Sequence, residues 1–134
     1  MKMTETELKN RFKNWAISVV LFTKKFPHGQ EFNAVRGQIV RSTPSAAANY
    51  RAACRGKSTP DFINKLKIVE EELDESMFWL EFVVALASNL RSDVVPLYKE
   101  ADELLAIIVS SIKTTRQKQE QSQNRKSKIV NPKS

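Results

Sequence analysis

The sequence has little of what disulfides, metal sites and nucleophilic active sites require. It contains one cysteine, Cys54, and one histidine, His28, far apart in the chain. An internal disulfide is therefore excluded, and these two side chains make a poor zinc site. The facing Glu-x-x-His pairs of di-iron bundles and the glycine-rich loops of phosphate sites are both missing. Cys54 is expected to pack, since no nearby base would activate it. We predict no catalytic residue, no metal site, no cofactor and no enzymatic activity.

Glycine, proline and long apolar runs are also scarce. Only 3 glycines and 5 prolines are present, which argues against an all-β chain with many turns. The longest apolar runs, 82–87 and 104–109, fall far short of the roughly 20 residues of a membrane span. The segment 15–22 begins too late for a signal peptide and is followed by two lysines. We expect no membrane association and no small-molecule substrate. A reducing cytoplasm is the simplest compartment for a chain with one cysteine.

Charge of one sign dominates each part of the chain. The net charge is +7, but residues 1–58 carry +8, residues 59–116 carry −5 and residues 117–134 carry +4. Such halves can attract each other within one chain or between chains, although scattered solvated charge would give the same sums.

Apolar residues recur at steps of three and four in the first half of the chain, as in amphipathic helices. A first helix is expected to begin at a Thr4–Glu7 capping box and to end at 26–29, where proline and glycine favour a turn. A second should run from about Gln30 to Arg55, bent at Pro44 and stopped by Gly56. The residues that recur along one face of each helix form a seam that should pack into the core. The seams are Leu8, Phe12, Trp15, Val19, Phe22 and Phe26 in the first helix, and Phe32, Val35, Ile39, Ser42, Ala46, Asn49 and Ala53 in the second.

The second half repeats the pattern. A third helix should start after Ser58, a suitable N-cap, and a fourth should run from about Val94 to Arg116 after a break near 89–93. Their seams are Phe62, Leu66, Val69, Leu73, Ser76, Leu80, Val83, Ala87 and Leu90 in the third, and Leu97, Ala101, Leu104, Ile108 and Ser111 in the fourth. Short connections make consecutive helices antiparallel neighbours. We therefore predict an all-α, antiparallel up-down-up-down four-helix bundle over residues 1–116.

Residues 117–134 lose this periodicity and are rich in Gln, Ser, Asn and Lys. This basic C-terminal tail is expected to be disordered, or else a fraying extension of the fourth helix. Flexible basic segments can neutralise nucleic-acid phosphates without reading sequence, but they also serve as plain solubilising ends. The candidate nucleic-acid contacts are Lys9, Arg11, Lys13, Lys24, Lys25, Arg125, Lys126 and Lys128.

Five acids within residues 70–75 wrap around the third helix, opposite the arginines of the second. In an antiparallel hairpin, Arg41 falls level with Asp74 and is expected to pair with Asp74 or Glu71. Carboxylates beside arginines should remain ionised and structural rather than act in acid–base catalysis. Asn49 lies on the second seam and is expected to fix the register of the helices, with a ligand contact as the alternative. The polar residues assigned to structural or interface roles are Arg41, Asn49, Arg51, Arg55, Glu71, Asp74 and Glu75.

Residues 45–55, Ser-Ala-Ala-Ala-Asn-Tyr-Arg-Ala-Ala-Cys-Arg, and the matches that continue through 57–58, 61–62, 65–66, 68–75 and 79–81 resemble a known family. It is the family of four-helix-bundle proteins encoded in intervening sequences of bacterial 23S rRNA genes. The resemblance covers most of residues 8–115. Many members carry Asn-Ile-Ala-Glu-Gly where this chain has Asn-Tyr-Arg-Ala-Ala at 49–53, so any role of that Glu and Gly does not transfer.

The resemblance implies a bundle and a homopentamer. It also implies a relation to the accessory protein of diversity-generating retroelements, which is thought to bind nucleic acid. Most members have no established activity.

Two functions follow from these observations. The first is a non-enzymatic, homo-oligomeric accessory module that binds RNA or DNA, favoured by a continuous exposed basic stripe on the first helix. The alternative is a protein–protein interaction scaffold without nucleic acid, favoured if Arg41 and Arg51 are buried against Glu71 and Glu75. An enzyme would need a closed pocket with convergent polar groups, which the sequence does not indicate.

Overall fold

The computed structural model describes residues 3–130, and their side chains through Lys128. Four α-helices account for most of this range: α1 (Glu5–Phe22), α2 (Gln30–Cys54), α3 (Thr59–Leu86) and α4 (Arg91–Val130). Two short 3₁₀ helices, η1 (Thr23–Lys25) and η2 (Ser88–Leu90), lie at the α1–α2 and α3–α4 connections. No strand occurs among residues 3–130, which confirms the predicted all-α class.

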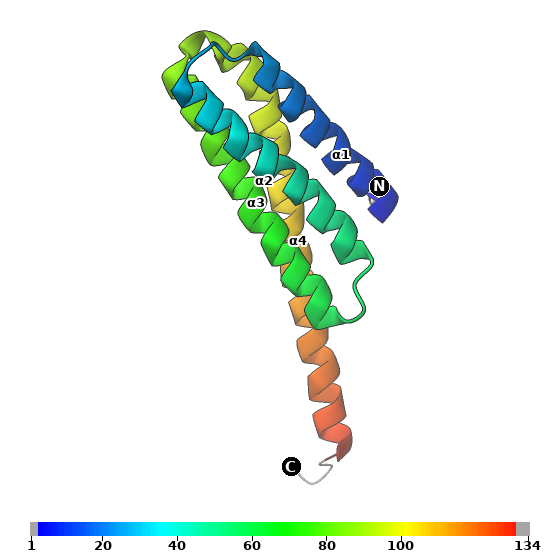
Figure 1. Ribbon diagram of the computed structural model, residues 1–134. Coiled ribbons are helices and arrows are strands. Elements are labelled where there is room, and N and C mark those ends of the chain that lie inside the picture. The colour runs from blue at the N-terminus through cyan, green and yellow to red at the C-terminus, as the bar shows by residue number, and fades with distance from the viewer. Residues whose placement is uncertain (1–2, 131–134) are drawn as a thin grey trace.

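The helices lie side by side along one another, and α4 extends beyond the other three (Figure 1). α2 packs against α1 and α3, while α4 packs against α3 and α1, so the four helices enclose one core. The α1–α2 and α3–α4 connections lie at the same end, and the α2–α3 connection lies at the other (Figure 1).

The N-terminal caps of α1 and α3 form where the sequence places them, whereas α3 ends at Leu86 and α4 begins at Arg91, a few residues earlier than predicted. Thr4 and Glu7 make both bonds of the predicted capping box, and the Ser58 hydroxyl accepts from the Asp61 amide. These contacts satisfy amide groups that have no partner inside the helix. Gly29 precedes α2 with a φ of 148°, a value that side chains with a Cβ rarely adopt.

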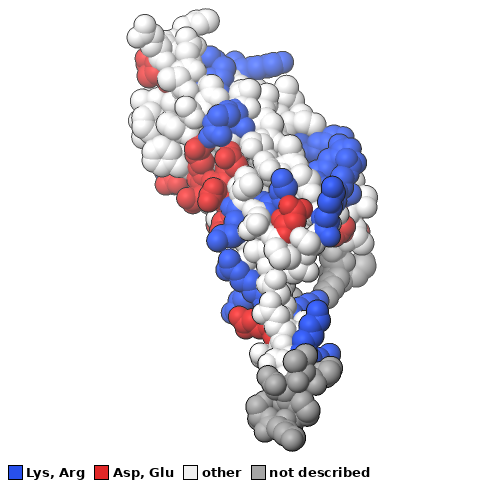
Figure 2. Space-filling view, turned by 60° about the horizontal axis from the view of Figure 1, so that its bottom comes forward, with Lys and Arg blue, Asp and Glu red and all other residues white. Residues whose placement is uncertain are grey.

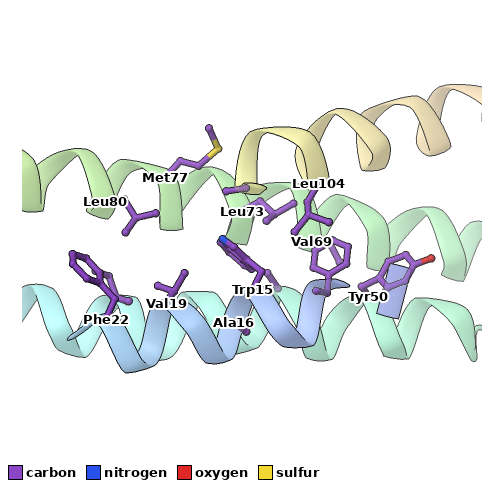
Figure 3. Packing of buried hydrophobic residues seen from close by; sticks show 14 of the residues in the cluster. Trp15, Ala16, Val19, Phe22, Tyr50, Val69, Leu73, Met77, Leu80 and Leu104 are labelled. Atoms are coloured by element: carbon purple, nitrogen blue, oxygen red, sulfur yellow. The ribbon is translucent and has the colours of Figure 1, made fainter. Parts of the chain in front are cut away.

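Most of the core comes from the predicted apolar seams, and Ala16, Tyr50 and Met77 are buried with them (Figure 3). All six seam residues of the first helix region are buried, as are Leu66, Leu73 and Leu80 of α3. The Phe12 and Tyr50 rings stack with their centroids 4.9 Å apart. Of the predicted seam positions, only Asn49, Phe62, Leu97 and Ser111 are partly exposed. Burial of these seams supplies the main favourable term for folding.

A small hydroxyl cluster interrupts the apolar core between α2 and α3. Ser42, Thr43 and Ser76 are fully buried. Thr43 donates to the Ser76 hydroxyl at 3.2 Å, and Ser76 Oγ lies 3.0 Å from Ser42 Oγ and 2.8 Å from the Glu72 carbonyl oxygen. These contacts satisfy polar groups that would otherwise be costly to bury.

The C-terminal segment differs from the expected disordered tail. α4 continues without a break through Val130, so the alternative of a helical extension is the one observed for residues 117–130. The segment is rich in Gln, Glu, Lys and Arg, which are good helix formers. It also continues an existing helix and needs no new nucleus. Lys133 and the rest of 131–134 lie outside the described residues.

Candidate functional site

Two of the predicted nucleic-acid contacts are engaged within the chain. Arg11 on α1 donates from Nε to one carboxylate oxygen of Glu100 at 2.9 Å and from Nη2 to the other at 2.5 Å. It also contacts Glu103 at 2.7 Å. Lys25 in η1 reaches Asp93 at 2.6 Å. These ion pairs connect the N-terminal region to α4. Because Arg11 and Lys25 are neutralised by acids of the chain, the first helix does not present the continuous free basic stripe that was predicted.

The Arg11 contact changes the acidity of its partner. Hydrogen bonding to the guanidinium lowers the pKa of Glu100 from its ordinary value of 4.5, although partial burial opposes the shift. The pKa of Arg11 is raised, first by its hydrogen bond to Glu100. Both groups are therefore charged at neutral pH, and the pair is a structural tie rather than an acid–base couple.

The Arg11–Glu100 pair is expected to stabilise the fold above about pH 4.5 and to lose that contribution as the pH falls. The unfolded chain takes up the Glu100 proton first, since the folded pKa is the lower one. Replacing Glu100 with Gln should cost about 1 kcal/mol at pH 7, and the difference from wild type should shrink in acid. Urea unfolding at several pH values measures this. A difference that does not shrink as the pH is lowered below 4.5 would contradict the assignment.

Arg41 pairs with the acidic run, but with other carboxylates than expected. It contacts Glu72 at 3.2 Å and also the Glu75 carboxylate. The predicted partners Asp74 and Glu71 are exposed instead. Each partner lies one residue further along α3 than predicted, Glu72 in place of Glu71 and Glu75 in place of Asp74. One residue turns a side chain by about 100° around the helix. Glu75 keeps its structural role, as an ion pair within the chain.

Asn49 does not occupy the core seam. Its side-chain amide donates to the Ser45 carbonyl at 2.9 Å and lies 3.1 Å from the Ser45 hydroxyl, both on α2 itself. The buried position belongs to Tyr50, one residue later. The prediction that Asn49 fixes the register between helices is therefore wrong, because its amide bonds one turn back along its own helix.

A hollow lies between α1 and α2. This groove encloses about 650 Å³. Its apolar part includes Ile17, Leu21 and Pro44, and two alanines of α2 leave room there. Its cations are Lys9, Lys13, Arg51 and Arg55, none of which forms an ion pair among the described residues. Each of these cations could be named from the sequence. Their position around one apolar groove could not, because it depends on how α1 and α2 pack against each other.

A second apolar surface lies on the outer side of α3. Phe78 is 53% exposed and Phe82 is 40% exposed. Their ring centroids lie 4.9 Å and 5.6 Å from that of Trp79 and 6.1 Å from each other. The exposed residues that form this ridge are Ile68, Glu71, Asp74, Phe78, Glu81 and Phe82, and one cation, Lys67, is exposed on the same side four residues before Glu71. Steps of three and four place them along one side of the helix. The ridge is therefore both apolar and acidic.

The extension of α4 carries the third surface. At 100° per residue, Lys118, Arg125, Lys126 and Lys128 fall within about 160° of the helix circumference. A shallow hollow lined by Lys118, Gln121, Ser122, Arg125 and Lys126 confirms that most of them share one face. Glu120, the one acid of 117–134, falls on the opposite side. Figure 2 shows lysines and arginines along this extension and a separate gathering of acids on the bundle.

Outside these three surfaces, the described residues include few groups suited to metal binding or nucleophilic chemistry. Among the described residues, no three His, Cys, Asp or Glu side chains are grouped so that they could hold a metal ion. Burial raises the pKa of the Cys54 thiol, which disfavours the reactive thiolate. Burial likewise raises the pKa of the neighbouring Tyr50 phenol. Within residues 3–130, no helix combines the length and apolarity needed to cross a membrane.

Comparison with known proteins identifies the relatives of this fold. A solved structure from Bacteroides thetaiotaomicron, described as a protein of unknown function from the S23 ribosomal protein family, is 30% identical with a TM-score of 0.75. The match covers 83% of this chain and 99% of that one. No curated protein matches the chain. The model of the 23S rRNA-intervening sequence protein family matches residues 4–110. The chain therefore belongs to the family of 23S rRNA-intervening sequence proteins.

Proposed function

We propose that this protein is a non-enzymatic accessory module that binds nucleic acid, with the extension of α4 as its main contact. The observation that carries the proposal is the cationic face formed by Lys118, Arg125, Lys126 and Lys128. Residues 117–128 contain no apolar side chain, and all are exposed except Gln119. Lysine, arginine, glutamine and serine are the side chains that contact phosphates and sugars. A protein-docking face would instead be expected to offer aromatic or aliphatic anchors.

The bundle cations fit this function less well than the sequence suggests. Arg11 and Lys25 already neutralise carboxylates of the chain, while Lys24 is exposed. Lys9 and Lys13 border an aliphatic groove whose lining contains no aromatic ring for base stacking. We therefore assign the phosphate contacts to the extension first and keep Lys24 as a secondary candidate.

Neutralising the face should weaken binding far more at low salt than at high salt. With four phosphate contacts, the logarithm of the binding constant should fall by about 0.9 per contact with the logarithm of salt concentration. Duplex binding by the wild-type chain should then drop about 10²-fold between 50 and 200 mM salt. The variant K118Q/R125Q/K126Q/K128Q should show weak binding and a shallow slope. Fluorescence anisotropy with a labelled duplex DNA and a labelled structured RNA measures both.

The control variant K57Q/K67Q/R91Q/K99Q removes the same charge from exposed positions on the bundle. It should retain most of the affinity and slope, because these side chains lie outside the extension. Absence of binding by the wild-type chain at 50 mM salt would refute the proposal for both nucleic acids. Equal losses of affinity in the two variants would show that binding depends on net charge and not on the face of the extension.

We also propose that the chain folds as an up-down-up-down antiparallel bundle and assembles into a homo-oligomer. The alternating ends of the three connections support the antiparallel order (Figure 1). The exposed aromatic cluster of Phe78 and Phe82 on α3 supports assembly, since contiguous apolar patches mark interaction sites. The family resemblance implies five copies. Light scattering gives the mass directly, and a monomer at micromolar concentration would contradict this part.

A protein–protein scaffold without nucleic acid is the second candidate. The groove between α1 and α2 favours it, because aliphatic side chains with a charged border are typical of helix-docking surfaces. The same binding experiment separates the candidates, since a scaffold predicts no steep salt dependence with either nucleic acid.

A further inference from the structure

The groove between α1 and α2 and the ridge on α3 are unlike surfaces that complement each other. The groove is aliphatic with four cations, and the ridge is apolar with three acids, Glu71, Asp74 and Glu81, against one cation, Lys67. Glu81 also accepts a hydrogen bond from Tyr98 of the same chain. None of these eight charged side chains forms an ion pair among the described residues. Unpaired charges of opposite sign beside exposed apolar groups are the pattern of two surfaces that bind each other.

On both surfaces the charged side chains lie at a similar distance along the helix from the apolar ones. On α1, Lys9 precedes the groove residue Ile17 by eight residues, and Lys13 precedes Leu21 by the same number. Eight residues correspond to about 12 Å along the helix.

On α3, Glu71 precedes Phe78 by seven residues and Asp74 precedes Phe82 by eight, or about 11 to 12 Å. An alignment that sets the acids against the cations therefore also sets the rings against the aliphatic floor. No shift along the helix is needed to satisfy both contacts.

We propose that the groove of one copy receives the α3 ridge of a second copy of this chain. The inference rests on the self-assembly proposed above and names the two surfaces that make the contact. Glu71 and Asp74 face Arg51 and Arg55 and the α1 lysines, while Phe78 and Phe82 cover Ile17 and Leu21. Arg51 and Arg55 thus pair between copies, whereas Arg41 pairs within one.

The contact is heterologous, since each copy offers one groove and one ridge on different helices. Contacts of this kind link copies head to tail and close into a ring when the rotation permits. The cationic extension of α4 belongs to neither surface and remains available to nucleic acid. Repeating the extension in an assembly would raise the avidity of a weak phosphate site.

Mixing two disabled variants tests this arrangement. I17D/L21D disables the groove and F78D/F82D disables the ridge, both at exposed positions of the free chain. Each variant alone is expected to be monomeric by light scattering, with a wild-type helical signal by circular dichroism. An equimolar mixture should form a complex of two chains and nothing larger, because one intact groove meets one intact ridge. V109D alters an apolar side chain that is 45% exposed on α4 and should keep the wild-type mass.

Charge exchange gives a second readout that does not depend on apolar side chains. R51E/R55E and E71K/D74K should each lower the assembled fraction at least tenfold, and the four substitutions in one chain should restore it. Wild-type mass in either aspartate variant, or a mixture that stays monomeric, would overturn the inference while leaving self-assembly through other surfaces intact. A wild-type chain that is itself monomeric would refute the proposed assembly together with this contact.

Discussion

Replacing Leu73 with Ala is expected to lower the free energy of unfolding by about 2–5 kcal/mol. Leu73 is fully buried at the middle of α3 and faces the other helices (Figure 3). Truncation removes apolar contact and leaves a cavity that the rigid surrounding helices fill only in part. Urea unfolding followed by circular dichroism measures the loss.

Leu86→Ala is the matched control for that measurement. It makes the same change on the same helix at a side chain that is 40% exposed. Its cost should stay below about 1 kcal/mol, since little apolar surface is removed from contact. Equal costs at the two positions would show that Leu73 does not occupy the core.

Replacing Trp15 with Ala is expected to cost about 3–5 kcal/mol. Trp15 is 3% exposed, and its indole N–H donates to the Leu97 carbonyl on α4 at 3.0 Å. The side chain thus contributes both apolar burial and a hydrogen bond between α1 and α4. Its loss should free α1 more than any other helix, because α1 packs less extensively on α4 than on α2.

Trp15→Phe separates the two contributions. It keeps most of the buried ring but leaves the Leu97 carbonyl without this donor, so a cost of about 1–2 kcal/mol is expected. Hydrogen exchange should show faster opening of α1 in the alanine variant than in the phenylalanine variant. Wild-type stability in both variants would contradict the packing of α1 described above.

The architecture could be read from the sequence because its apolar periodicity and helix caps agree. The seams through Phe12, Ile39, Leu66 and Leu104 are buried where the three-and-four spacing predicts. The Thr4 cap and the Ser58 cap form as expected. Local signals of this kind depend on neighbours within one or two turns, which a sequence displays directly.

Contacts between helices could be predicted only approximately. The sequence indicated that Arg41 meets the acidic run, yet the partners are Glu72 and Glu75, since a small axial shift changes which side chain faces across. It did not indicate that Arg11 pairs with Glu100, because no local pattern relates residues 89 positions apart. The groove was missed for the same reason, as it exists only where α1 and α2 meet.

The helical extension could have been anticipated in part. Gln119, Gln121 and Gln123 lack the apolar spacing of a core helix, which suggests disorder when periodicity alone is considered. Helix propensity and continuity with a packed stem are sufficient to favour a helix here. Once the segment is helical, its cations acquire a common face that a disordered tail would not have.

The most direct measurement compares the wild-type chain with a variant of identical composition whose cations are dispersed around the helix. Q123K/N124R/R125N/K126Q exchanges two cations with adjacent polar residues and leaves length, net charge and Lys118 and Lys128 unchanged. If the helical face of the extension binds the phosphates, duplex affinity at 50 mM salt should fall about tenfold, with a shallower salt slope. Equal affinity and slope would contradict the account, since binding would then depend on net charge and not on the helical face.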